Sequence, residues 1–330
     1  ANPDKKLVMR TLAFSGDEVV RRPREEGYPS PDELLTLVRA NVIFAFFGYN
    51  ESYCHDPEMF KNDLRNFIDE TRTKQYDGKA APRIVLFSPI AHENLNSPNL
   101  PSGEEDNLWL SIFTDAMARV ANEKGVPFVD LYAPSKALYD KIDEPLTING
   151  IHLNDRGNRE IAKVIVEALG QRADDSLLGP VRAAVLDKNW CWFNRYHATD
   201  GNDVWGNRSV LKFVDDQTNA EVLQHELVML DVMSANRDEV IWKAAQEKTA
   251  TPDDSNVPHP IEVKTNYAPS EKNGALTFVP ASQGVSTIKL GKGLAANLFA
   301  SEETFSEIVN PVQMDVDTKG RLWVASWETY

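Results

Sequence analysis

One histidine in this sequence lies where general acid–base chemistry could be done. His152 stands in the run Leu-Thr-Ile-Asn-Gly-Ile-His-Leu-Asn at residues 146–154. A neutral imidazole can take a proton from a hydroxyl or a water and return it to a leaving group, provided that a third group fixes its tautomer. Asn149, three residues upstream, is placed to be that group. The alternative is an ordinary surface histidine in an Asn-Gly turn.

The residues after His152 predict the element that would hold it. Asn154 has the side chain of a helix N-cap, and the chain after it carries apolar residues at helical spacing, namely Ile161, Val164, Ile165 and Ala168. We therefore expect His152 to sit on a rigid corner between a loop and a helix.

The N-terminal half alternates between strand and helix patterns. Strands are predicted at residues 6–14, 40–47, 82–89 and 127–131, and helices at residues 31–38, 57–73 and 106–124. Such alternation predicts an α/β fold with a doubly wound parallel sheet, whose ligands bind beyond the carboxyl ends of the strands. The apolar run at 40–47 is expected to be covered on both faces. Loops that begin at Ser15, Gly48, Ile90 and Leu146 should all open toward one end of this sheet.

Three short motifs follow these strands in order. They read Ser-Gly-Asp-Glu at residues 15–18, Gly-Tyr-Asn-Glu at 48–51 and Asn-Gly-Ile-His at 149–152. Together they resemble the SGNH (GDSL-type) hydrolase family of esterases and lipases, over residues 6 to about 170. The resemblance implies a flavodoxin-like sheet and a site for carboxylic esters. It also implies that the Gly16 backbone and the Asn50 side chain donate to the oxyanion while His152 is the general base. Without it, Gly16 and Asn50 would be ordinary turn residues.

The chemistry of acyl transfer agrees with these roles, because donors preorganised around the developing oxyanion contribute a few kcal/mol each. Ser15, beside Gly16, completes the candidate active-site residues as a possible nucleophile. Tyr49, Glu51 and His92 are expected to contact the substrate, and His92 with Glu93 is an alternative acid–base pair. Other nucleophiles that the sequence offers are Ser52, Cys54 and Ser88. No metal-ligand spacing is present, and no cofactor is predicted.

Two departures from the family pattern matter. The sequence contains no Gly-Asp-Ser, the motif that ends the nucleophile strand, so we expect the first strand of the sheet to be missing and the chain to be truncated at its N-terminus. Asn149 stands where the family has aspartate. An asparagine can hold an imidazole but cannot stabilise its cation, and the corresponding change in the serine-protease triad costs about 10⁴ in turnover.

The C-terminal half lacks further strand–helix units. We predict a hydrolase-like domain at 1–172, a helical extension with an aromatic loop at 173–248, a linker at 249–283 and the start of a β-propeller at 284–330. The aromatic loop, at 189–207, is interpreted as packing rather than as a lid. A strand-turn-strand segment is expected at 284–299, and a hairpin at 311–325 around an Asp-Thr-Lys-Gly turn. These last residues resemble the entry to a propeller of the sugar-dehydrogenase type, as in large multidomain bacterial proteins.

The amino-acid composition disfavours some classes of binding partner. The net charge of -15 disfavours binding to nucleic acid, and no stretch has the roughly 20 apolar residues of a membrane span. A small ester or an acylated carbohydrate is the expected substrate. Two other functions stay open: a non-catalytic binding module attached to a propeller-type dehydrogenase, and a helper of such a dehydrogenase. The compartment and the redox state of Cys54 and Cys191 also stay open, although the family resemblance is compatible with export.

Overall fold

A computed structural model describes residues 2–23, 27–172, 178–198, 201–212, 216–263 and 279–327. The chain forms two compact units, which are described separately. The first unit comprises Ala1–Tyr196 and Leu230–Val257, and the second comprises His197–Met229 and Pro258–Tyr330.

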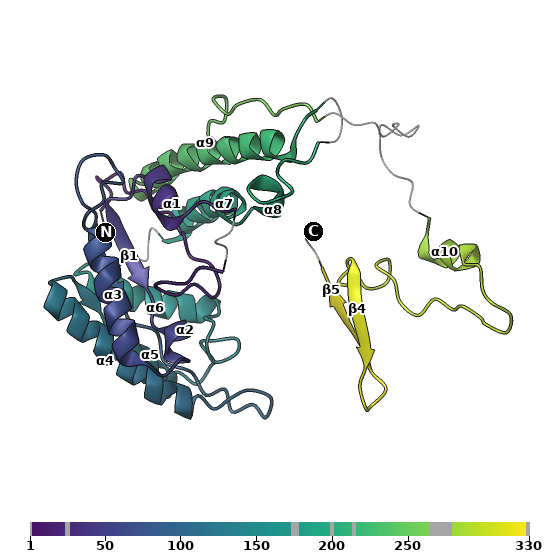
Figure 1. Cartoon of the computed structure of the whole chain (residues 1–330), viewed down its shortest axis with the longest axis horizontal. Coiled ribbons are helices and arrows are strands. Elements are labelled where there is room, and N and C mark those ends of the chain that lie inside the picture. The colour runs from purple at the N-terminus through teal and green to yellow at the C-terminus, as the bar shows by residue number, and fades with distance from the viewer. Residues whose placement is uncertain are drawn as a thin grey trace. The chain divides into compact units, whose positions relative to one another are not determined.

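The first unit is built on a parallel sheet. Strands β1 (Val42–Phe46), β2 (Arg83–Phe87) and β3 (Phe128–Val129) lie in the order β1-β2-β3. The helices that accompany them are α1 (Pro31–Leu37), α2 (Tyr49–Ser52), α3 (Pro57–Thr71), α4 (Glu104–Lys124), α5 (Tyr132–Lys141), α6 (Asp155–Ala168), α7 (Leu178–His197) and α9 (Asn219–Ala245), which continues from the second unit (Figure 1). The predicted alternation of strands and helices and the parallel sheet are confirmed.

Strand β2 is the centre of the core because side chains on both of its faces are buried. Ile84 and Leu86 pack in one apolar cluster with Phe60 of α3 and Met117 of α4. Val85 and Phe87, on the other face, pack in a second cluster with Ile161 of α6. The two faces of this strand are thus covered by different helices.

The expectation that residues 40–47 are covered on both faces is wrong. Within β1 only Ala45 is buried, while Phe44 and Phe46 are 36% and 53% exposed. Their rings contact Phe87 on the neighbouring strand. The apolar run predicted the strand correctly, whereas coverage of a face depends on elements that the run itself does not encode.

Residues 6–14 do not form the predicted strand. Their backbone carbonyls bind side chains of two helices instead: Leu7 O accepts from Trp242 Nε1 at 2.7 Å, Met9 O from Lys188 Nζ at 3.2 Å, and Thr11 O from Trp192 Nε1 at 2.7 Å. The segment is therefore held by helix side chains in place of the backbone pairing that a strand requires.

The aromatic segment that begins at residue 189 is helix rather than loop through His197, since α7 continues to that residue. Lys188, Trp192 and Tyr196 follow one another at intervals of four, so they lie on one face of α7. This face meets the carbonyls of residues 9–12, where Tyr196 donates its hydroxyl proton to Leu12 O. Trp192 and Tyr196 are buried there, in agreement with the packing interpretation.

The second unit contains α8 (Gly201–Val204), α10 (Ala281–Thr287), β4 (Pro311–Val316) and β5 (Leu322–Ser326). The predicted hairpin is confirmed, since β4 and β5 pair in antiparallel fashion around residues 317–321. The strand-turn-strand segment at 284–299 is wrong: α10 occupies its beginning, and residues 288–299 contain no strand. Gly291 and Gly293 weaken any strand in that stretch.

Part of the predicted linker at 249–283, namely residues 264–278, lies outside the described residues. Residues 249–263 have neither helix nor strand, and α10 begins inside the predicted linker, at Ala281. Among the described residues, no helix has the length and apolar character needed to cross a membrane.

Candidate active site

The turn that carries His152 is closed by backbone pairing just before α6. Ile148 N donates to His152 O at 2.9 Å, and Asn154 N donates to Leu146 O at 2.9 Å. The side chain of Asn154 then caps α6 by accepting from Arg156 N and Gly157 N. The predicted N-cap is thus confirmed, and His152 sits on a defined corner at the start of this helix.

Asn149 is oriented toward the His152 ring. Its Oδ1 lies 3.0 Å from His152 N and 3.1 Å from His152 Nδ1. Because an amide oxygen can only accept, the ring proton must be on Nδ1, which leaves the lone pair of Nε2 available to accept a proton. His152 is exposed and Asn149 is half-buried, so this nitrogen can be reached from solvent.

The buried carboxylate of Glu93 stabilises the same turn by accepting hydrogen bonds from it. This group accepts from Leu146 N at 2.9 Å, from Thr147 N at 2.7 Å and from Thr147 Oγ1 at 2.6 Å. Thr147 Oγ1 in turn accepts from Gly150 N at 2.9 Å. Both oxygens of Glu93 are engaged in this way, which favours a bracing role over the acid–base role considered for it.

The expected oxyanion donors come from the Gly16 turn and from helix α2, which are joined by a hydrogen bond. Gly16 has a φ of +82° in a turn closed by Asp17 N donating to Phe14 O at 3.2 Å, and Ser15 and Gly16 are exposed. Asn50 Nδ2 donates to Asp17 O at 3.0 Å. A side-chain amide has a second N–H, and that N–H is the one available to a ligand.

The buried carboxylate of Glu51 also links the segment that follows Gly16 to the start of α2. Its Oε1 accepts from Val19 N and its Oε2 from Gly48 N, both at 2.8 Å. Burial raises the pKa of the Glu51 carboxyl, while the hydrogen bonds from these backbone amides oppose the rise. The side chain is only 8% exposed, which favours a bracing role over the substrate contact that we predicted.

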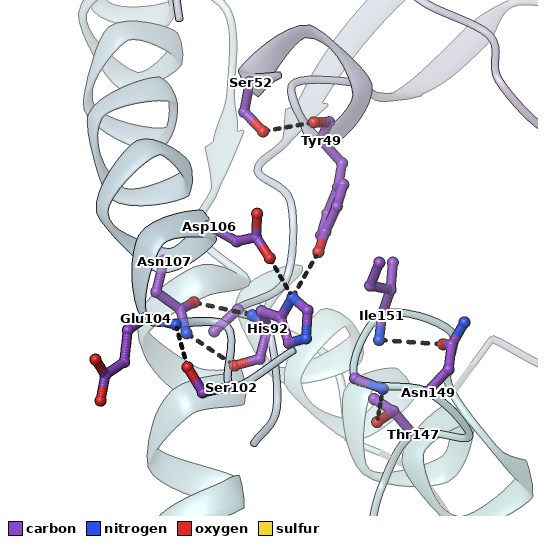
Figure 2. A network of polar contacts seen from close by, with 12 residues as sticks. Tyr49, Ser52, His92, Ser102, Glu104, Asp106, Asn107, Thr147, Asn149 and Ile151 are labelled. Atoms are coloured by element: carbon purple, nitrogen blue, oxygen red, sulfur yellow. Dashed lines mark hydrogen bonds and ion pairs between the residues drawn. The ribbon is translucent and has the colours of Figure 1, made fainter. Parts of the chain in front are cut away.

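His92 also lies inside the protein, with 3% of its surface exposed, so a direct substrate contact is not supported. Its Nδ1 lies 2.7 Å from Asp106 Oδ2 and 3.4 Å from the hydroxyl of Tyr49. Figure 2 shows both groups directed at the ring. Burial, followed by the neighbouring Tyr53, raises the pKa of Tyr49, which therefore keeps its proton. The sequence analysis missed Asp106, which is one of three acidic residues in the first turn of α4 and has no distinguishing local pattern.

Two of the other candidate nucleophiles are buried, unlike Ser15. Ser52 is buried and donates to Tyr49 O at 2.6 Å. Ser88 is buried at the end of β2, where its Oγ accepts from Leu131 N at 2.7 Å. Cys54 is an exposed free thiol that donates to Glu51 O, and Cys191 is a buried free thiol.

Hydrogen bonds and packing connect the segments of Gly16, Asn50, His92 and the His152 turn. Asn50 and Glu51 join the turn of Gly16 to the start of α2, and Tyr49 connects α2 to His92. That the Asn50 amide and the His152 ring face one cleft stays a prediction. Among the described residues, no group of three or more His, Cys, Asp and Glu side chains is arranged to hold a metal ion.

One family model matches part of the chain. Residues 2–160 match the model of the GDSL-like Lipase/Acylhydrolase family. No curated protein matches the chain.

Several solved structures are similar at low identity. A catalytic mutant of an acetylxylan esterase from Geobacillus stearothermophilus is 15% identical, with a TM-score of 0.34 over 41% of this chain and 62% of that protein. A member of the lipolytic protein G-D-S-L family from Veillonella parvula is 17% identical, with a TM-score of 0.31 over 40% and 64%. A carbohydrate acetylesterase from Sinorhizobium meliloti is 15% identical, with a TM-score of 0.34 over 48% and 75%. The chain thus spans less than two thirds of the length of the first two.

Proposed function

We propose that the GDSL-like lipase/acylhydrolase domain at residues 2–160 holds an acyl-transfer site in which His152 is the general base. The observation that carries the proposal is the hydrogen bond between Asn149 Oδ1 and His152 Nδ1, at 3.1 Å. It gives the exposed imidazole the tautomer in which Nε2 removes a proton from a hydroxyl or a water. Asn149 is its orienting group.

In the proposed reaction, the oxygen from which His152 takes a proton attacks the carbonyl carbon of an ester. Negative charge then develops on the carbonyl oxygen, where Gly16 N–H and the second N–H of Asn50 donate to it. The hydrogen bond from Asn50 Nδ2 to Asp17 O supports this pairing, because it fixes the side chain beside the turn of Gly16. When the tetrahedral intermediate collapses, His152 returns the proton to the leaving alcohol.

The substrate class that fits this chemistry is a small carboxylic ester or an acylated carbohydrate. Since the sequence contains no Gly-Asp-Ser, we expect little hydrolysis of a short-chain aryl ester by this chain. The base and the oxyanion donors can be tested separately by supplying the nucleophile from solution. Hydroxylamine is small and neutral near pH 7, and its acyl transfer product is a hydroxamic acid that can be measured directly.

The experiment measures protein-dependent hydroxamate formation from a short-chain aryl ester. We expect a rate above the background that is lost in His152→Ala and lowered about 10²-fold in Asn50→Ala, the effect of removing one oxyanion donor. Asn99→Ala, a change at an exposed loop asparagine, is the control. A rate that is equal in the unchanged chain and in His152→Ala would contradict the proposal. Robust hydrolysis that disappears in Ser15→Ala would place the nucleophile at Ser15.

A binding module for esters or carbohydrates, attached to a propeller-type dehydrogenase, is the second candidate. It is favoured by the positions of Ser52 and Ser88, which are both buried and hydrogen-bonded within the protein. This function predicts that an acylated sugar binds the chain and that no hydroxamate forms. Binding measured by calorimetry together with the rate therefore separates the two functions.

For the hairpin β4–β5 we retain the proposal that it begins a propeller blade. All the residues of β4 and β5 are exposed, which leaves both faces open to further packing. A two-stranded hairpin is marginally stable in water at best. A peptide of residues 305–327 should therefore be largely unfolded by circular dichroism, and a stably folded peptide would remove the reason for the proposal.

A further inference from the structure

The His92 ring is a contact point for three segments of the candidate site. On one side it meets Tyr49, the residue before Asn50, at 3.4 Å from Nδ1. At the start of α4 the ring contacts Asp106. The backbone N of His92 donates to Asn107 Oδ1 at 2.9 Å, and the backbone O of His92 accepts from Asn107 Nδ2 at 2.8 Å. The far edge of the ring lies against Gly150, in the turn of His152.

The contact with Gly150 is close enough to determine the path of that turn. A Cβ atom at Gly150 would lie 2.3 Å from His92 Nε2, and one at Gly103 would lie 2.5 Å from His92 Cδ2. Gly150 also has a φ of +91°, which a residue with a side chain rarely adopts. The imidazole is thus enclosed between two glycines, and the Asn149–His152 turn follows its surface.

Asp106 fixes how the ring is turned between these glycines. Because a carboxylate can only accept, the bond of 2.7 Å requires a proton on His92 Nδ1. Nε2 is then directed toward Gly150, and among the described residues it has no hydrogen-bond partner although it is fully buried. A buried nitrogen without a partner is unusual and calls for an explanation. Tyr49 is a second titratable group in contact with the ring.

We propose that His92 is a positioning residue that couples the segment of Asn50 to the Asn149–His152 turn. Asp106 sets the orientation of its ring, and the ring supports the turn at Gly150. This inference rests on the proposed function, because positioning matters only if His152 is the base. Since His92 is buried, it acts through the Asn149–His152 hydrogen bond and not on the substrate.

The test reads the His152 ring itself and needs no substrate. The full chain is labelled with ¹⁵N-histidine, and the signals of His152 are assigned among the six histidines with His152→Gln. Long-range ¹H–¹⁵N spectra are recorded at about pH 8.5, where an ordinary imidazole is neutral. We expect a single tautomer with the proton on Nδ1 in the unchanged chain.

Three variants and one control test whether His92 positions the turn. His92→Asn keeps a donor for Asp106 and removes the ring edge at Gly150, so we expect His152 to lose its single tautomer. Asp106→Leu should have the same effect, because the ring is no longer held, whereas Asp106→Asn keeps an acceptor oxygen and should preserve the tautomer. Val120→Ala, in the buried core of α4, is the control for a general loss of stability and should leave His152 unchanged.

An unchanged His152 spectrum in folded His92→Asn or in folded Asp106→Leu would overturn the inference. If His92→Asn does not fold, the Asp106 variants decide it, since that side chain is 28% exposed and tolerates replacement better. The result is separate from the proposed function. A chain without acyl transfer in which the tautomer responds as expected would contradict the function and leave the coupling by His92 intact.

Discussion

Asn149 Oδ1 lies 3.1 Å from His152 Nδ1. Replacing this amide oxygen by a charged one keeps the hydrogen bond and adds an electrostatic attraction for the imidazolium that forms during the reaction. We therefore expect Asn149→Asp to raise the rate of hydroxamate formation. The loss of about 10⁴ for the reverse change in the serine-protease triad sets the upper limit of the gain.

Asn149→Ala is the matched variant, since it removes the acceptor without adding charge. Its rate should fall below that of the unchanged chain. If the aspartate variant is no faster than the alanine variant, Asn149 does not orient the base.

Glu93 gives a prediction about stability, because it is buried and braces the turn with both oxygens. Glu93→Gln replaces one oxygen by an NH₂ group that faces the donors of Leu146 and Thr147. The unsatisfied groups should lower the free energy of unfolding by about 1–3 kcal/mol, measured by urea denaturation. Glu70→Gln, at an exposed position of α3, should change it by less than about 0.5 kcal/mol. Equal effects of the two changes would contradict a bracing role for Glu93.

How much of this site the sequence predicts depends on the range of each interaction. The hydrogen bond between Asn149 and His152 is local, and so is the cap at Asn154, which was correctly predicted because Asn154 and the amides that it accepts lie within three positions of each other. The partner of His92 was not: Asp106 is fourteen residues away on another element, and nothing in the local pattern separates it from its acidic neighbours. The sequence nominated His92 and Glu51 for substrate contact from their place after strands, but it could not show that their side chains turn inward.

In the fold, too, local features were predicted correctly and long-range features were not. Helices α1, α3, α4 and α6 and the three strands of the sheet follow from local periodicity, and so does the hairpin of β4 and β5. Residues 6–14 have the composition of a strand, yet a strand also needs a neighbouring backbone. The signal for the actual arrangement was present in the spacing of Lys188, Trp192 and Tyr196, whose intervals of four indicate one helix face. The prediction of a loop at these aromatic residues overlooked this helical spacing.

The same helix face leads to a prediction about the attachment of residues 6–14. Trp192→Phe keeps most of the buried ring and removes the donor to Thr11 O. The loss of this hydrogen bond should lower the free energy of unfolding by about 1 kcal/mol and speed proteolysis near residue 10. Trp190→Phe, on the same helix but 63% exposed, is the control. If both variants are cleaved at the rate of the unchanged chain, the indole does not hold the segment.

The pH dependence of the hairpin follows from Asp317. Hydrogen bonds from Trp323 Nε1 and from the backbone N of Arg321, both at 3.0 Å, lower the pKa of the Asp317 carboxyl to about 2. Because this value lies below the ordinary 3.8, the carboxylate stabilises the hairpin fully above about pH 4, and this stabilisation is lost as the pH falls through about 2. The indole N–H signal of Trp323 in NMR spectra should therefore move toward that of a free indole between pH 4 and pH 2. In Asp317→Asn, which keeps an acceptor but does not titrate, the signal should stay constant over this range, and an equal shift in both proteins would show that another group is responsible.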